Sequence, residues 1–272
     1  MRKRHLLTVS LCVLVLAGSG LAITSGSLDT THDSVGAIII DDPEYGPFVV
    51  CSGTLVDDEN NVFLTAGHCS STIKGWIAAG YFTMDDVYVC FDDDVWDEDA
   101  TWVPVSSIDA HPDFTRNATL DYDVAAIVLD PEDGTDLPTP ANLAAPGYLD
   151  DLKDDGELKG GPKKVLFTVV GYGTQLSFPP PEIVPVDGKR RKTESGYLSL
   201  QTLKLFLLQN QSAGFGGSGY GDSGGPVFWT DGDGKEHLVA VTSWGDPKLV
   251  ATGIYQRADL ETVHEFLEDV AD

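Results

Sequence analysis

Three short segments of the sequence carry side chains that could together catalyse acyl transfer. His68 follows an apolar segment, Asp123 opens another, and Ser223 lies in a glycine-rich turn. A serine hydroxyl becomes a nucleophile when a base takes its proton and a carboxylate orients that base. Backbone N–H groups must also reach the developing oxyanion, and glycine permits such a close approach. We therefore predict His68 as the base, Asp123 as the orienting carboxylate and Ser223 as the nucleophile, with the N–H groups of Gly221 and Ser223 as oxyanion donors.

Each of the three segments also has a simple structural explanation when it is taken alone. A histidine beside a cysteine is usually structural, an aspartate before a strand usually ends a turn, and a glycine-rich stretch can be a flexible loop. Their joint appearance in the order His, Asp, Ser favours the catalytic interpretation.

The rest of the sequence has the pattern of an all-β protein. Apolar residues make up 42% of the chain and charged residues 22%, which is enough apolar material for a packed core. Residues 260–270 form one amphipathic helix with Asp259 as its N-cap, and 178–193 and 92–99 are expected to be exposed loops. Many short strands between turns predict a β-barrel or a sandwich. The expected strands are 35–40, 48–56, 81–91, 124–129, 165–171, 227–230 and 238–243.

The motifs resemble those of the trypsin-like (chymotrypsin-fold) serine endopeptidases, in particular the bacterial secreted type. The three segments read TAGHC at 65–69, DVA at 123–125 and GDSGGP at 221–226. A fourth, SWG at 243–245, resembles the strand that lines the substrate cleft. The likeness runs from about residue 23 to the terminal helix and is weakest between residues 130 and 215.

This resemblance implies two six-stranded antiparallel β-barrels packed together, followed by the C-terminal helix. The protease domain would span 23–272, with barrel halves at approximately 23–135 and 136–272. The triad would lie in the crevice between the barrels.

The N-terminal residues 1–22 have the three parts of a secretory signal peptide: a basic start, an apolar run and small residues before a cleavage point. A retained membrane anchor is the alternative, but the apolar run is shorter than the roughly 20 residues that a spanning helix needs. We expect a secreted protein without stable membrane association after signal removal. The net charge of −26 argues against binding to nucleic acid. We expect a monomer that acts on protein or peptide substrates, with no cofactor and no metal.

Three cysteines remain once Cys12 leaves with the signal, so one disulfide and one free thiol are the simplest arrangement in an exported protein. The family resemblance implies that Cys51 and Cys69 form the disulfide, since CSGTL at 51–55 resembles the strand that pairs with the histidine loop. Cys90 is then expected to be a small buried residue.

The resemblance also implies how the enzyme would be activated. In this family a freed N-terminal Ile or Val pairs with the Asp beside the nucleophile, here Asp222. Ile23 directly follows the expected signal cleavage point, so signal removal itself would produce the activating amine. The alternative is that Ile23 is merely the end of the apolar signal.

The primary substrate pocket is expected to be open and uncharged. Gly217 takes the place of the residue at its base, Gly245 and Gly253 line its walls, and Ser243 and Trp244 complete the cleft. Without a carboxylate at the base, the pocket should prefer apolar or aromatic residues before the scissile bond.

The sequence departs from the family at one position of this pocket. Gly219 stands where a cysteine is usual, so the disulfide that normally braces the pocket is absent.

Two other functions fit parts of the sequence. The segment around Ser223 also satisfies the nucleophile elbow of a serine esterase, but Pro226 and the β-type residues after it argue against the helix which that fold requires. A catalytically inactive binding protein of the same fold is the second alternative. Such proteins usually lose a triad residue or the oxyanion glycine, and here all are present.

Overall fold

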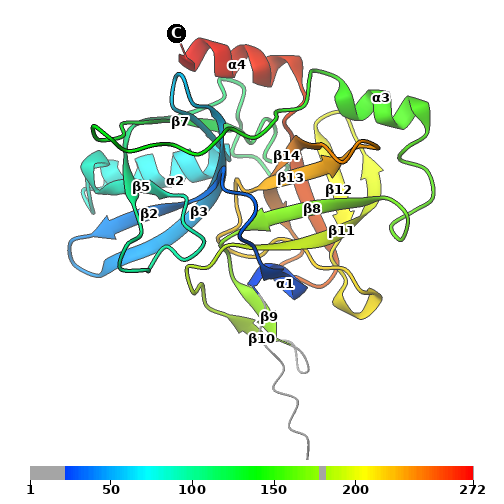
Figure 1. Ribbon diagram of the computed structural model, residues 1–272, viewed down its shortest axis with the longest axis horizontal. Coiled ribbons are helices and arrows are strands. Elements are labelled where there is room, and N and C mark those ends of the chain that lie inside the picture. The colour runs from blue at the N-terminus through cyan, green and yellow to red at the C-terminus, as the bar shows by residue number, and fades with distance from the viewer. Residues whose placement is uncertain (1–21, 178–181, 272) are drawn as a thin grey trace, which may run out of the picture.

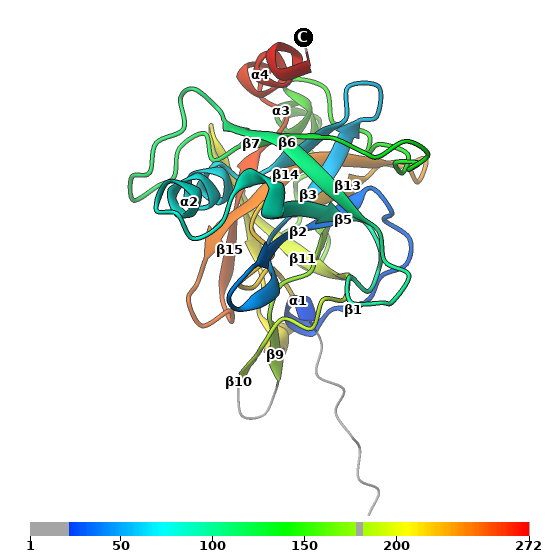
Figure 2. The same cartoon turned by 90° about the vertical axis from the view of Figure 1, so that its left-hand side faces the viewer.

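The computed structural model describes residues 22–177 and 182–271, and two antiparallel β-barrels lie side by side in it (Figure 1). In the first barrel, β5 pairs back onto β2 and so closes the order β2-β3-β4-β7-β6-β5. Figure 2 brings this barrel to the front. Its strands are β2 (Val35–Asp42), β3 (Gly46–Asp57), β4 (Val62–Thr65), β5 (Val87–Cys90), β6 (Trp102–Ala110) and β7 (Ala125–Leu129).

The second barrel closes because β8 pairs with both β11 and β13. Its strands are β8 (Leu166–Gly171), β11 (Arg191–Leu200), β12 (Lys204–Leu208), β13 (Pro226–Thr230), β14 (Glu236–Gly245) and β15 (Thr252–Arg257). Short strand β1 (Ser27–Leu28) adds to the edge of β11, while β9 (Gln175–Ser177) and β10 (Glu182–Val184) form a separate hairpin. Two six-stranded antiparallel barrels and a C-terminal helix confirm the predicted fold class.

The C-terminal helix α4 (Glu261–Ala271) agrees with the prediction, but two further helices were not expected. These are α2 (Gly67–Ala78), which follows β4, and α3 (Tyr148–Asp155), which lies in the chain between β7 and β8. A short irregular turn, α1 (Ala22–Ser25), opens the described chain, and single 3-10 turns lie at Met84–Asp86 and Gln211–Ala213. Within the described residues, no helix has the length and apolar character to cross a bilayer.

Two of the local predictions were wrong in part. The expected strand 81–91 is extended only over β5, because Thr83 and Asp86 form a capping box that favours a 3-10 turn before it. The expected loop 178–193 has its last residues in β11 and buries the side chain of Arg190, whereas 178–181 lie outside the described residues.

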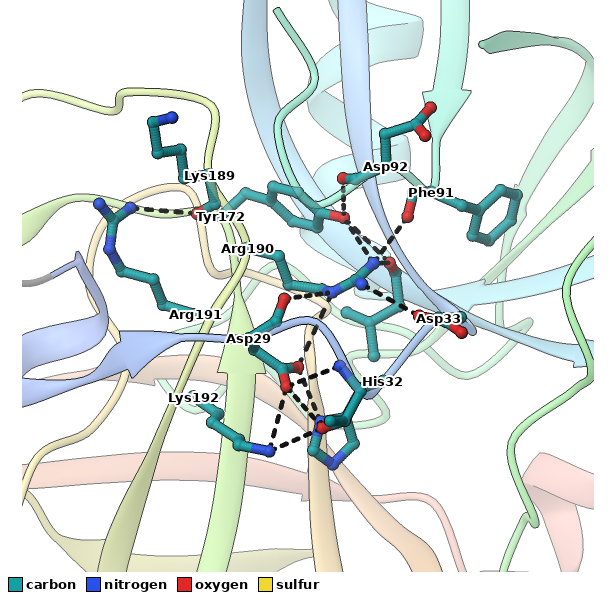
Figure 3. Close-up of polar contacts among 12 residues, drawn as sticks. Asp29, His32, Asp33, Phe91, Asp92, Tyr172, Lys189, Arg190, Arg191 and Lys192 are labelled. Atoms are coloured by element: carbon teal, nitrogen blue, oxygen red, sulfur yellow. Dashed lines mark hydrogen bonds and ion pairs between the residues drawn. The ribbon is translucent and has the colours of Figure 1, made fainter. Parts of the chain in front are cut away.

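Tyr172 and Arg190 from the second barrel bind backbone groups of the first and thereby fix how the barrels pack (Figure 3). The Tyr172 hydroxyl donates to the carbonyl of Asp92 at 2.8 Å. The guanidinium of Arg190, only 2% exposed, donates to the carbonyl of Phe91 at 2.6 Å and to the Tyr172 oxygen at 3.2 Å. The Nη2 nitrogen of the same guanidinium donates to the Asp33 carboxylate at 3.3 Å. Because carbonyl and carboxylate oxygens satisfy this guanidinium, its charge can be buried.

Cys51 in β3 and Cys69 in α2 form a disulfide, with Cα atoms 6.4 Å apart, as predicted. Cys90 is free and buried, and burial raises the pKa of its thiol to about 12. A thiol of that kind is protonated at neutral pH and is therefore unreactive.

We expect the double replacement Cys51→Ala, Cys69→Ala to lower the free energy of unfolding by about 3 kcal/mol, because the unfolded chain loses a closed loop. Urea unfolding followed by circular dichroism measures this loss. Reductant should lower the free energy of unfolding of the parent by a similar amount and leave that of the double variant unchanged. Equal stability of parent and variant would contradict the prediction.

Candidate active site

His68 and Asp123 are brought together by the ends of two neighbouring strands. His68 is the second residue of α2, directly after β4, and Asp123 precedes β7, which pairs with β4. The Asp123 carboxylate accepts the backbone N–H of His68 through Oδ1 at 2.8 Å, and its Oδ2 lies 2.8 Å from His68 Nδ1. Asp123 is fully buried, whereas the His68 side chain is 21% exposed. Since an ionised carboxylate can only accept, Nδ1 carries the proton and Nε2 is left as the base.

The second barrel supplies two more groups to Asp123. Ser243 in β14 donates its hydroxyl to Asp123 Oδ2 at 2.6 Å, and the Asp123 N–H donates to the side-chain oxygen of Gln256 in β15 at 3.1 Å. The carboxylate is therefore held from both barrels, and its orientation toward His68 depends on how they pack.

Ser223 lies in the turn before β13, and this turn docks on the first barrel. The Ser52 N–H donates to the Ser223 carbonyl at 2.8 Å, and the Ser52 hydroxyl donates to the Gly221 carbonyl at 3.0 Å. Gly224 has a φ of +80°, and a Cβ on it would overlap the Thr65 hydroxyl. Only glycine fits at this close approach between the barrels.

The N–H groups of Gly221 and Ser223 find no hydrogen-bond acceptor within residues 22–177 and 182–271. The left-handed conformation of Gly221, with φ of +95°, shapes this turn. Two unpaired N–H groups beside a serine hydroxyl can bind a carbonyl oxygen that gains negative charge.

A cavity of about 540 Å³ is lined by both His68 and Ser223. Ser243, Trp244 and Gly245, which we expect in the substrate pocket, also line it. The other two predicted pocket residues are not among its lining residues. A Cβ on Gly217 would meet the buried side chain of Gln209, and one on Gly253 would meet the ring of Tyr255.

Leu249 forms part of this cavity, which the sequence did not indicate. Leu249 is only 5% exposed. Its φ of +58° lies in the left-handed region, which residues other than glycine rarely adopt. Its Cδ1 lies 3.4 Å from the position of a Cβ on Gly219. The Tyr220 hydroxyl, next to Gly219, donates to the Pro247 carbonyl at 3.2 Å. That hydrogen bond ties two pocket segments together where the family's usual disulfide is absent.

Ile23 is fully buried, and the next residue, Thr24, is paired with Gly217. The Thr24 N–H donates to the Gly217 carbonyl at 2.9 Å, and the Gly217 N–H donates to the Thr24 hydroxyl at 2.9 Å. Because the chain continues into Ala22, Ile23 here has an amide and no charged amine.

Asp222 is fully buried beside the nucleophile. Burial raises the pKa of its carboxyl group to about 7, although hydrogen bonds from the N–H groups of Gly219 and Gly173, each 2.7 Å long, oppose the shift. The guanidinium of Arg191 also opposes the shift, but it is paired with Asp187, and no cation of the described residues forms an ion pair with Asp222.

Among the residues that the structure describes, one group of possible metal ligands is formed by Cys51, His68 and Cys69, whose ligand atoms lie within 4.8 Å of one another. Both sulfur atoms belong to the disulfide, so no thiolate is available to bind a metal there.

The two closed barrels are those of the chymotrypsin fold. The family model for trypsin matches residues 34–263, which is most of the chain. The chain therefore belongs to the trypsin family, a family of serine peptidases.

Proposed function

We propose that this protein is a secreted serine endopeptidase that hydrolyses peptide bonds with His68, Asp123 and Ser223. The observation that carries the proposal is the pair of 2.8 Å contacts between the Asp123 carboxylate and His68, with His68 and Ser223 lining one cavity. This arrangement fixes the ring so that Nε2 can take the serine proton.

The reaction would proceed through an acyl-enzyme. Ser223 Oγ attacks the peptide carbonyl carbon while His68 Nε2 takes its proton, and the N–H groups of Gly221 and Ser223 bind the oxyanion. His68 then gives that proton to the leaving amine as the C–N bond breaks. Water, deprotonated by His68, attacks the ester, and the acid product leaves as Ser223 regains its proton.

A fluorophosphonate probe tests the nucleophile directly. We expect peptide mass spectrometry to find the adduct on Ser223 in folded protein with a confirmed N-terminus, and we expect Ser223→Ala protein to remain unlabelled. Labelling of neither protein would favour the inactive binding protein. Labelling together with turnover of esters but not of peptides would favour the serine esterase.

The cavity is lined mostly by uncharged residues, and the carboxylate of its lining residue Asp246 accepts the N–H of Val250. This lining supports a preference for apolar or aromatic residues before the scissile bond. Leu249, which is only 5% exposed, forms part of the cavity wall and so limits the cavity volume. We expect Leu249→Ala to raise kcat/KM for phenylalanine relative to alanine at this position by roughly 10-fold, since apolar pockets discriminate by volume. A peptide library measures the ratio.

Val250→Ala serves as the matched control because Val250 follows Leu249 but does not line the cavity. It should leave the phenylalanine-to-alanine ratio within about 2-fold of the parent. Preferential cleavage after lysine or arginine in the parent protein would contradict the proposed specificity.

Secretion would follow removal of residues 1–22, and the Cys51–Cys69 disulfide is consistent with an oxidising compartment. We propose that this cleavage also activates the enzyme, because it would free the amine of the buried residue Ile23, which could then pair with the buried carboxyl group of Asp222. N-terminal sequencing of protein recovered from the culture medium should read Ile-Thr-Ser-Gly. Any other start would contradict the coupling of export to activation.

A further inference from the structure

Lys204 is a buried lysine that contacts the groups behind the candidate triad. It opens β12, and the residue is 6% exposed. Its ammonium group donates to the Leu120 carbonyl at 2.6 Å and to the Ser243 oxygen at 3.2 Å. Burying a lysine without good partners is costly, so such a residue calls for an explanation.

The two acceptors of Lys204 both belong to the active site. Leu120 lines the cavity of His68 and Ser223, and the Ser243 hydroxyl donates to Asp123 Oδ2 at 2.6 Å. Because Ser243 accepts from the ammonium group, its single proton is directed to the aspartate. A continuous hydrogen-bond chain therefore runs from Lys204 through Ser243 and Asp123 to His68.

The loop that Lys204 holds is conformationally strained. Leu120 and Tyr122 have φ values of +46° and +52°, and neither is a glycine. Conformations of this kind persist when the surroundings fix them. The hydrogen bond to the Leu120 carbonyl pins this loop, three residues before Asp123.

The charged groups near Lys204 come from the segment before β7 and from β15. Burial lowers the pKa of its ammonium group to about 8, while the carboxylates of Asp123 and Asp121 oppose that shift. On the β15 side, Gln256 is neutral, and the guanidinium of Arg257 is engaged by Asp259 and Asp150. Lys204 therefore keeps its charge in the range around pH 6.5 where histidines titrate.

We propose that Lys204 is a positioning residue of the active site, which directs the Ser243 hydroxyl to Asp123 and, by its positive charge, makes His68 a weaker base. A cation beside the aspartate stabilises the carboxylate and disfavours a protonated imidazole. His68 would then stay unprotonated at lower pH, so the enzyme would work in more acidic media. This inference rests on the proposed peptidase function.

Lys204→Met is the main test, because methionine has similar length and suits a buried site. We expect the acid limb of the kcat/KM profile to move up by roughly half to one pH unit, with KM little changed. Activity at pH 6 should fall about 3- to 10-fold. Lys204→Arg should keep the parent profile, and Lys235→Met, which removes an exposed lysine, should do so too. A profile that does not move in Lys204→Met overturns the proposal and leaves Lys204 a purely structural residue.

The link through Ser243 is tested by repeating Lys204→Met in Ser243→Ala protein. In the Ser243→Ala background we expect Lys204→Met to move the acid limb of the kcat/KM profile by less than half as much as in the parent. A movement of equal size in both backgrounds overturns the assignment of Ser243 as the link. Thermal unfolding confirms that the variants are folded, and Lys204→Gln replaces Lys204→Met if the latter does not fold.

A measurement without turnover separates this proposal from the peptidase proposal. In Ser223→Ala protein, NMR follows the titration midpoint of the His68 ring directly. We expect Lys204→Met to raise this midpoint by the same roughly half to one unit. A raised midpoint supports the role of Lys204 even if the parent protein cleaves no peptide, and an unchanged midpoint overturns it.

Discussion

Replacing Asp123 by asparagine is expected to lower kcat by about 10⁴-fold while KM changes little. The carboxylate now accepts the His68 backbone N–H, the His68 ring and the Ser243 hydroxyl. An asparagine amide has one oxygen and one NH₂ group, so it cannot accept from all three. The NH₂ group would favour the tautomer with the proton on Nε2, which cannot take the Ser223 proton. Steady-state kinetics on a peptide substrate measures the loss.

Asp113→Asn is the matched control for this variant. Asp113 is an exposed aspartate that does not line the cavity, so its replacement should leave kcat within about 2-fold of the parent. Both variants should unfold near the temperature of the parent. Asp123→Asn protein that keeps more than about one hundredth of the parent kcat would contradict the role of Asp123.

The second large effect on activity is expected from removal of the residues before Ile23. A chain that begins at Ile23 should have kcat/KM about 10²- to 10³-fold higher than one that retains Ala22, because breaking a buried ion pair costs about 3–5 kcal/mol. Ile23 is already buried and Thr24 already binds Gly217, so this segment is docked before the amine is freed. Asp222 is the buried carboxylate that this amine would pair with. Kinetics on the two purified chains measures the ratio.

Asp222→Asn provides the companion measurement. In the chain that begins at Ile23 it should cause a loss similar to that from retaining Ala22. In the uncut chain it should cause little further loss, because there the carboxyl group has no cation to lose. Equal activity of the cut and uncut chains would exclude this mode of activation.

The carboxyl group of Asp222 should also make the free energy of unfolding of the uncut chain depend on pH. Its pKa of about 7 when folded exceeds the ordinary value of 3.8, so the folded chain binds more protons between these values. The contribution of Asp222 to the free energy of unfolding is therefore fully present below pH 4 and is lost as pH rises to 7, by up to about 4 kcal/mol. Urea unfolding at pH 4.5 and 7.5, compared with Asp222→Asn, measures the difference. The amine of Ile23 should abolish it in the cut chain.

Much of the fold follows from local sequence patterns. Short apolar segments between turn residues predicted β2, β3, β7, β8, β13 and β14, and the amphipathic pattern predicted α4. The histidine, aspartate and serine segments could be found because each has a compact motif. Helix α2 escaped prediction, since it buries only Gly67, Cys69, Ser70 and Ile73 and so has no strong apolar periodicity.

The sequence by itself determined the family, because the family motifs consist of residue types at short and characteristic spacings. Through the resemblance to that family it also implied the Cys51–Cys69 disulfide, which the structure contains. The tertiary structure alone decided which distant groups surround the three motif segments. Lys204 and Gln256 lie far along the chain from Asp123, and Leu249 lies apart from Ser223, so no local pattern could assign them to the site. Their places follow from the pairing of β12 with β15 and from the packing of one barrel against the other. Long-range contacts of this kind are set by how strands and barrels pack, and a sequence pattern reports only on near neighbours.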